Sequence, residues 1–144
     1  MYDIWRMLAV NDLQTLNAKR QALINIPEQI AELEAQATSI RSATADGTPV
    51  KGGGSGREAM LLNNISERDD LKEELEQIQK CVARIDRALG VLTATEQRIL
   101  QVRYIDREPG AISKLSCELN LDERTVRNRL SDALKQFSIA MRGK

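Results

Sequence analysis

The sequence is poor in the residue types that most often build metal sites, disulfide frameworks and catalytic centres. Of its 144 residues none is histidine, two are cysteine and 3% are aromatic. Cys81 and Cys117 lie 36 residues apart, and no zinc site can be built from this pair without histidine. We expect both to be free thiols, buried or half-buried in helices. No nucleophile with a partner base can be recognised, so the sequence predicts no enzymatic activity, no metal and no cofactor.

Long apolar runs are also missing. No stretch approaches the roughly 18–20 apolar residues of a membrane-spanning helix, and no signal-peptide pattern opens the chain. We therefore expect a cytoplasmic protein with no membrane partner. Since 42% of the residues are hydrophobic and few of these are aromatic, the chain can form a modest aliphatic core, too small for a large globular enzyme.

The net charge of the chain is zero, because 21 Lys and Arg balance 21 Asp and Glu. The charges are nevertheless unevenly distributed along the sequence. Residues 1–92 hold 11 basic and 14 acidic side chains, a net charge of −3, whereas residues 93–144 hold 10 and 7, a net charge of +3. From Glu123 onward there are six basic side chains and two acidic ones. This modest excess of positive charge is typical of a region that binds phosphate.

The first part of the chain predicts a helical segment followed by a linker. Over residues 1–42, apolar residues recur at steps of three, four and seven, the spacing of an amphipathic helix. Pro27 falls inside this run and predicts a kink or a short break near Ile26. Residues 43–57 contain five glycines and one proline. Because this composition sustains neither a helix nor a packed core, we expect a flexible linker there.

The strongest helical pattern occupies residues 58–92. Its apolar positions from Leu71 to Leu92 alternate steps of four and three and form a heptad seam flanked by charged residues. Such a seam needs a partner helix, which is either residues 1–42 folded back as an antiparallel hairpin or a second copy of the chain. The seam mixes Leu, Ile and Val without a register-fixing Asn, so the sequence does not decide between the two.

Residues 93–144 carry the pattern of a helix-turn-helix domain. Thr93 to Glu96 is a capping box that opens a helix through Ile105, and a Pro-Gly pair then breaks the chain. A short apolar helix follows and reaches Asn120, which suits the left-handed conformation that ends a helix. Asp122 suits the N-cap of the next helix. Two helices joined by a three-residue turn form the motif whose second helix enters the DNA major groove.

The second helix of this motif has two distinct faces. At 100° per residue, one face gathers the apolar residues Val126, Leu130, Ala133, Leu134, Phe137 and Met141. The opposite face and its flanks carry Arg124, Thr125, Arg127, Asn128, Arg129, Ser131 and Lys135. These residue types form hydrogen bonds with base edges and phosphates, so the outward face is the candidate DNA-binding surface.

Two segments, LTATEQRILQVRYID and ISKLSCELNLDERTVRNRLSDALKQF, resemble region 4 of the bacterial sigma-70 family and its phage relatives. The matching pattern is LTxxE, then RY, a helix-turn-helix and an Ala-Leu pair at Ala133 and Leu134. The whole layout resembles the late-gene transcriptional regulators of the RinA and ArpU type, from phages and prophages of Gram-positive bacteria. The resemblance implies a protein of the bacterial host cytoplasm that binds a phage promoter and activates late genes, with host RNA polymerase as a partner.

The sigma-like pattern and the face of the second helix together predict a DNA-binding site. Its expected residues are Lys114, Glu123, Arg124, Thr125, Arg127, Asn128, Arg129 and Lys135. Arg124 and Asn128 are expected to read base edges, whereas Thr125 and the remaining basic side chains hold phosphates. Glu123 departs from the basic residue common at its position, and a carboxylate there can accept a hydrogen bond from cytosine N4.

Together these patterns predict an all-α protein with a long helical hairpin or coiled coil followed by a helix-turn-helix domain. Because one module of this size binds DNA weakly, we expect a homodimer formed through the helical region. The favoured function is a sequence-specific transcription regulator. Two other functions stay open: a DNA-packaging protein similar to the small subunit of a phage terminase, and a protein that binds polymerase or sigma factor without contacting DNA.

Overall fold

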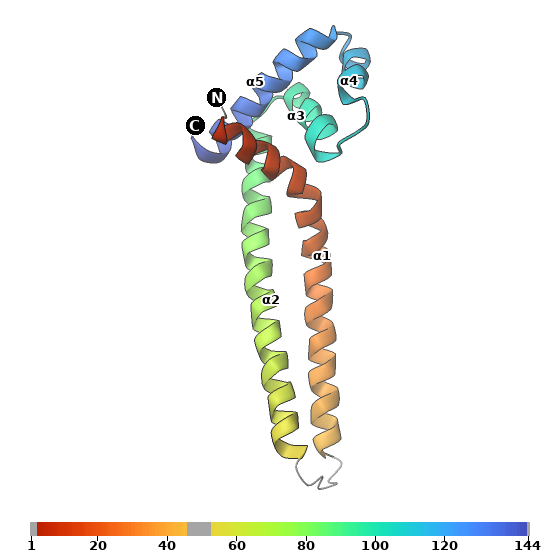
Figure 1. Ribbon diagram of the computed structural model, residues 1–144, viewed down its shortest axis with the longest axis vertical. Helices are drawn as coiled ribbons and strands as arrows, with labels where there is room; N and C mark the ends of the chain where they lie inside the picture. Colours follow the sequence, from red (N-terminus) through yellow and green to blue (C-terminus); the bar gives the residue numbers. More distant parts are fainter. Residues whose placement is uncertain (1–2, 46–52, 144) are drawn as a thin grey trace. The chain divides into compact units, whose positions relative to one another are not determined.

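The computed structural model describes residues 3–45 and 53–143, and all regular structure in these residues is helical. The helices are α1 (Ile4–Ala45), α2 (Gly53–Gly90), α3 (Ala94–Leu100), the short π-helix η1 (Gln101–Ile105), α4 (Ala111–Leu119) and α5 (Glu123–Arg142) (Figure 1). The predicted all-α class is therefore confirmed. None of the helices in the described ranges combines the length and the apolar character needed to cross a membrane.

Both long helices extend into residues 43–57, the stretch predicted to be a linker. α1 ends at Ala45 and α2 begins at Gly53, while residues 46–52 lie outside the described residues. α1 also continues through Pro27, so the break expected there does not occur. A helical proline removes one backbone N–H and crowds the preceding turn, a local defect that this 42-residue helix accommodates.

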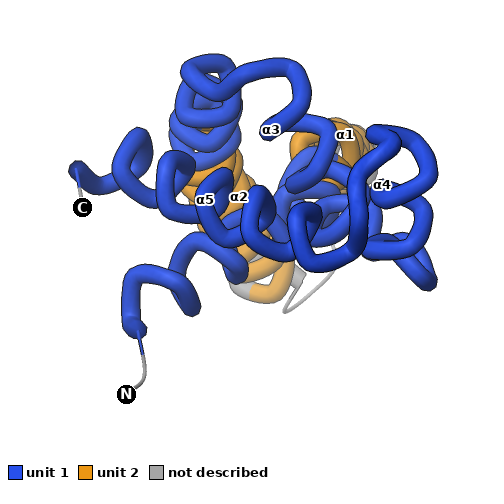
Figure 2. Tube along the Cα trace, turned by 90° about the horizontal axis from the view of Figure 1, so that it is seen from above, with its two compact units in different colours: residues 1–20, 80–144 blue, residues 21–79 orange. Residues whose placement is uncertain are grey.

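The chain divides into two compact units (Figure 2). Unit 1 consists of residues 1–20 and 80–144, and unit 2 of residues 21–79. The DNA-binding domain predicted from the sequence covers residues 93–144 alone. Unit 1 is larger, because it also contains the first turns of α1 and the last turns of α2.

In unit 2, α1 and α2 lie side by side and run in opposite directions (Figure 1). Asn64 of α2 is 6% exposed, and its side-chain nitrogen donates a hydrogen bond to the backbone oxygen of Leu33 at 2.7 Å. Its side-chain oxygen accepts a hydrogen bond from Arg68 Nε at 2.8 Å. The seam predicted from Leu71 onward therefore continues to a buried polar position, which matches one turn of α2 to one turn of α1 and fixes their register.

Unit 1 has a mainly aliphatic core, which includes the apolar face of α5. The six residues predicted on that face are all buried: Val126, Leu130, Ala133, Leu134, Phe137 and Met141. The ends of the long helices contribute Ala9, Leu13, Leu16, Val82, Ile85 and Ala88, each 7% exposed or less. These buried residues belong to the same compact unit as α5, so unit 1 reaches beyond residues 93–144.

The C-terminal end of α5 is held by charged side chains of both long helices. Asp12 of α1 forms an ion pair with Arg142, and Arg84 of α2 donates a hydrogen bond to the backbone oxygen of Met141 at 2.7 Å. The Asp12 and Arg142 side chains are only 12% and 26% exposed, so salt screens this pair less than a surface pair. α5 is thus anchored at the end opposite the predicted DNA-reading turns.

The two cysteines differ in their surroundings. Cys81 is half-buried, as predicted, and its sulfur lies 3.3 Å from Lys19 Nζ. The prediction is wrong for Cys117, which is exposed. Cys117 follows the buried Leu115 by two residues, which rotates its side chain about 200° around the helix and away from the core.

Candidate nucleic-acid interface

α3 begins with the predicted capping box. The Thr93 hydroxyl accepts a hydrogen bond from the Glu96 backbone N–H at 3.2 Å and donates one to the Glu96 carboxylate at 2.9 Å. The helical path continues to Ile105, but its last turn is wider than an α-helical turn, since the Asp106 N–H donates to the Gln101 carbonyl at 2.8 Å. π-type turns of this kind are rare and frequently lie near functional sites.

Three residues join α4 to α5, and the two capping residues among them take the predicted conformations. Asn120 is left-handed, with φ 57° and ψ 45°. Asp122 is extended, and its carboxylate accepts a hydrogen bond from the Thr125 backbone N–H at 3.2 Å. Hydrogen bonding by the Thr125 side chain, and also by its backbone, lowers the pKa of Asp122. The carboxylate therefore stays ionised at neutral pH, where it complements the positive end of the α5 dipole.

A bidentate ion pair joins α3 to α4. Arg98 Nη2 and Nε donate to the Glu118 carboxylate at 2.9 and 3.0 Å. Hydrogen bonding by Arg98 lowers the pKa of Glu118, and the same bond raises the pKa of Arg98. The side chains are 49% and 44% exposed, so the pair orients the two helices more than it stabilises them.

The residues predicted to bind DNA lie on the surface of α4 and α5. Seven are exposed, namely Lys114, Glu123, Arg124, Arg127, Asn128, Arg129 and Lys135, and Thr125 is half-buried. Around the axis of α5, Arg124, Asn128 and Lys135 form an outward row opposite the buried face. The structure thus groups the two predicted base-reading residues with one predicted phosphate ligand.

The flank of α5 beside α4 forms a shallow concavity, lined by Arg103, Ser113, Glu123 and Arg127 among others. Ser113 Oγ donates a hydrogen bond to Glu123 Oε1 at 2.9 Å, and Glu123 Oε2 lies 3.6 Å from Arg127 Nη2. The sequence singled out Arg103 only as part of the RY pattern, without a role in the site. It did not indicate Ser113, which shares no helical face with the predicted residues of α5.

The flank of α5 beside α3 forms a second groove, of mixed charge. Its lining includes Arg129 and Lys135 together with Glu96 and Asp132. Acidic side chains on this flank offset part of the positive charge expected there. Positive charge is therefore least opposed at Arg124, which, like Asn128, forms no hydrogen bond or ion pair with any described residue.

The net charges of the two units differ more than those of residues 1–92 and residues 93–144. Unit 1 contains 16 Lys and Arg and 10 Asp and Glu, a net charge of +6, whereas unit 2 contains 5 and 11, a net charge of −6. Since the outward row belongs to unit 1, the neutral chain presents it on a clearly cationic body. Long-range attraction of a polyanion would be directed to this unit.

Neither a metal site nor a similar protein indicates what this surface binds. Among the residues that the structure describes, no group of three or more Cys, Asp or Glu side chains is placed to hold a metal ion. Comparison with family models, with curated proteins and with solved structures finds no match to this chain. The chemistry of the α5 surface is therefore what points to a function.

Proposed function

We propose that the protein is a sequence-specific DNA-binding transcription regulator that inserts α5 into the major groove of duplex DNA. The observation that supports this most directly is the exposed row Arg124, Asn128 and Lys135 on a helix whose opposite face is buried. Arginine pairs with the O6 and N7 of guanine and asparagine with the N6 and N7 of adenine. α5 has 20 residues and so measures about 30 Å, long enough to lie along a groove.

The remaining basic side chains of the interface hold the phosphate backbone. Arg129 flanks the outward row and Lys135 ends it. Lys114 of α4 is exposed, and its Nζ lies 3.9 Å from the Glu108 carboxylate. Contacts of this kind set the orientation of a protein on the duplex without reading its sequence. The net charge of +6 on unit 1 strengthens them at low salt.

The resemblance to region 4 of the sigma-70 family and to phage late-gene regulators supports the narrower role. The bound sequence lies at a promoter of a phage or prophage, and the protein activates transcription there with host RNA polymerase as its partner. Footprinting on the genome that encodes the protein, with and without host polymerase, tests this role. Protection of a packaging site in place of a promoter would contradict it and leave DNA binding intact.

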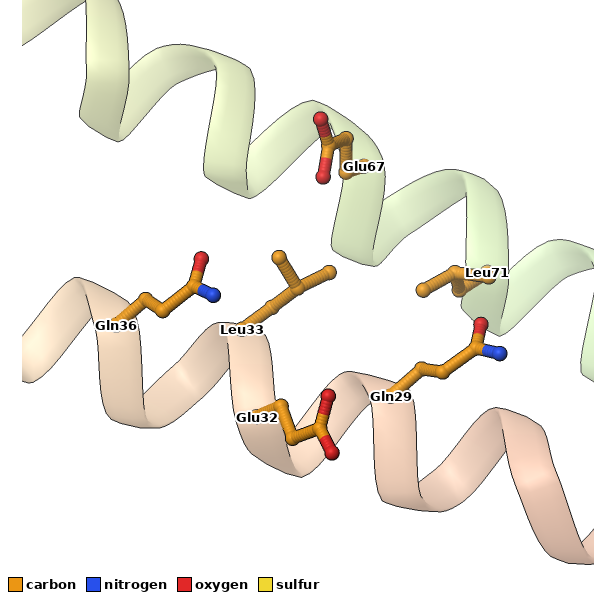
Figure 3. A pocket seen from close by; sticks show the side chains of 6 residues that line it. All are labelled: Gln29, Glu32, Leu33, Gln36, Glu67 and Leu71. Carbon is orange, nitrogen blue, oxygen red and sulfur yellow. The ribbon is translucent and has the colours of Figure 1, made fainter.

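Dimerisation through the long helices belongs to the same proposal, because two half-sites compensate for the weak binding of one module. The support comes from unit 2, where two packed helices leave Leu33 and Leu71 only half-buried. These leucines line a groove together with Gln29, Glu32, Gln36 and Glu67 (Figure 3). A second copy covers the groove and brings two α5 helices to a spacing of roughly 34 Å or a multiple of it.

Equilibrium sedimentation of the full chain at micromolar concentration is expected to show a dimer. Because unit 2 carries a net charge of −6, added salt screens the repulsion between copies and should tighten the dimer while it weakens DNA binding. A monomer at micromolar concentration that still binds its DNA tightly would contradict this part of the proposal.

DNA binding itself is tested by removing one charge from the outward row. Lys135→Ala is expected to weaken binding to every duplex alike and to reduce the slope of log K against log salt by about one. Lys72→Ala removes the same charge from an exposed position of α2 in unit 2 and serves as the control. Equal salt slopes for the parent and both variants, measured by fluorescence anisotropy, would show that α5 does not contact phosphate at Lys135.

A further inference from the structure

Glu123 is the one predicted site residue whose charge opposes DNA binding, and its carboxylate is engaged at both oxygens. Glu123 is the first residue of α5. Oε1 accepts the hydrogen bond from Ser113 Oγ of α4 at 2.9 Å, and Oε2 lies 3.6 Å from Arg127 Nη2, one turn further along α5. The carboxylate thus joins α4 to an arginine of the candidate DNA-binding surface.

The bond from Ser113 distinguishes this pair from an ordinary surface ion pair. A Glu and an Arg four residues apart on a helix attract one another weakly, and each keeps much of its rotational freedom. A hydrogen bond from a second helix restricts the carboxylate to orientations that satisfy Ser113, and the carboxylate in turn restricts the guanidinium. Within the described residues, Arg124 and Arg129 have no such partner.

We infer that Glu123, held by Ser113, positions Arg127, and that Arg127 reads a base edge. This inference rests on the proposed function and changes one assignment within it, because the sequence pattern alone predicts a phosphate contact for Arg127. A guanidinium with a fixed orientation suits bidentate recognition of guanine O6 and N7, which depends on geometry more than on charge. Glu123 is then a positioning residue that makes no contact with the DNA bases.

The positioning role gives a reason for a carboxylate on a surface that attracts phosphate. The carboxylate lowers the affinity for all duplexes by repulsion and raises the preference for duplexes with guanine opposite Arg127. The repulsion lowers the affinities for selected and unselected DNA alike, so any increase in their ratio comes from the positioning of Arg127 alone. The determinant of sequence preference therefore includes Ser113, a residue of α4 outside the recognition helix.

The test begins with duplexes that the full-length parent enriches from a randomised pool, and with unselected duplexes from the same pool. Ser113→Ala keeps the charge of Glu123 but frees its carboxylate. We expect it to reduce the affinity ratio about fivefold or more, the lower end of the effect of one bidentate base contact, without changing affinity for unselected DNA. Glu123→Gln is expected to reduce the ratio similarly and to tighten binding to unselected DNA.

Three further variants separate the positioning role of Glu123 from the effect of its charge. Arg127→Ala should abolish the guanine preference at the same single position, and adding Glu123→Gln to it should change the ratio no further. Asp132→Asn is the matched control, since it removes one negative charge from an exposed position of α5 that has no ion pair among the described residues. It should tighten binding to unselected DNA without shifting any base preference. Unchanged melting temperatures would exclude a purely structural effect.

The outcomes distinguish this inference from the proposed function. If Ser113→Ala and Glu123→Gln keep the affinity ratio and base preference of the parent, the positioning role is overturned while DNA binding stands. If Glu123→Gln alone changes the preference at a C·G pair and Ser113→Ala has no effect, Glu123 contacts cytosine directly and the inference is also overturned. If the parent enriches no duplex, the proposed function fails, and with it the positioning role.

Discussion

Replacing Phe137 by alanine is expected to lower the free energy of unfolding by about 3–5 kcal/mol. Phe137 has no exposed surface and is the largest fully buried side chain among the described residues of unit 1. It lies on the inner face of α5, so its removal leaves a cavity behind the helix that carries the proposed interface. Since small domains are stable by only about 5–15 kcal/mol, a large fraction of the variant should be unfolded at mild denaturant concentrations.

The neighbouring residue provides the control. Gln136 is exposed and has no hydrogen bond or ion pair among the described residues, so Gln136→Ala should change the free energy of unfolding by less than about 0.5 kcal/mol. Urea unfolding followed by circular dichroism measures both. Similar unfolding midpoints for the two variants would show that the inner face of α5 is not packed as the structure has it.

The buried face of α5 was predictable because the pattern behind it is local. Helical geometry alone places Leu130, Leu134 and Phe137 on one side, and the burial of that side follows from the hydrophobic effect. The conformations of Asn120 and Asp122 were predictable for a related reason, since each capping preference depends on the residue itself and a few neighbours.

Contacts between residues far apart in the sequence were not predictable. Asp12 and Arg142 are separated by 130 positions. Nothing in the sequence around either residue indicates that the two form an ion pair. Asn64 lies in a stretch where its polarity suggests exposure, yet the carbonyl of Leu33 supplies the hydrogen bond that permits burial. These contacts depend on how whole helices meet, which periodicity within one helix does not specify.

Some features of the candidate site were likewise predictable from the sequence, and others were not. The exposure of Arg124 and Asn128 follows from the helical angle between them and the apolar face. The bond from Ser113 to Glu123 depends on the angle between α4 and α5, so the sequence could offer Glu123 only as a possible base contact. The structure adds Ser113, the neighbour on which the proposed positioning role of Glu123 rests.

Arg124→Ala is expected to weaken binding to the enriched duplex by about 1–3 kcal/mol and to relax the preference at one base pair. Arg124 is exposed and has no hydrogen bond or ion pair with the described residues, so its removal should leave the melting temperature within a degree or two. The variant therefore separates recognition from folding, in contrast to Phe137→Ala. Anisotropy titrations against duplexes with each base at the affected position measure the effect.

Arg41→Ala is the control for Arg124→Ala, because it removes an exposed arginine from α1 in unit 2 and should alter neither affinity nor preference. Asn128 lies one turn after Arg124, so a helix that follows the groove brings the two side chains to neighbouring base pairs. Asn128→Ala should accordingly relax a preference for adenine beside the position read by Arg124. If Arg124→Ala weakens all duplexes equally, Arg124 holds a phosphate. The outward row would then orient the protein without reading sequence, and selectivity would depend on Arg127.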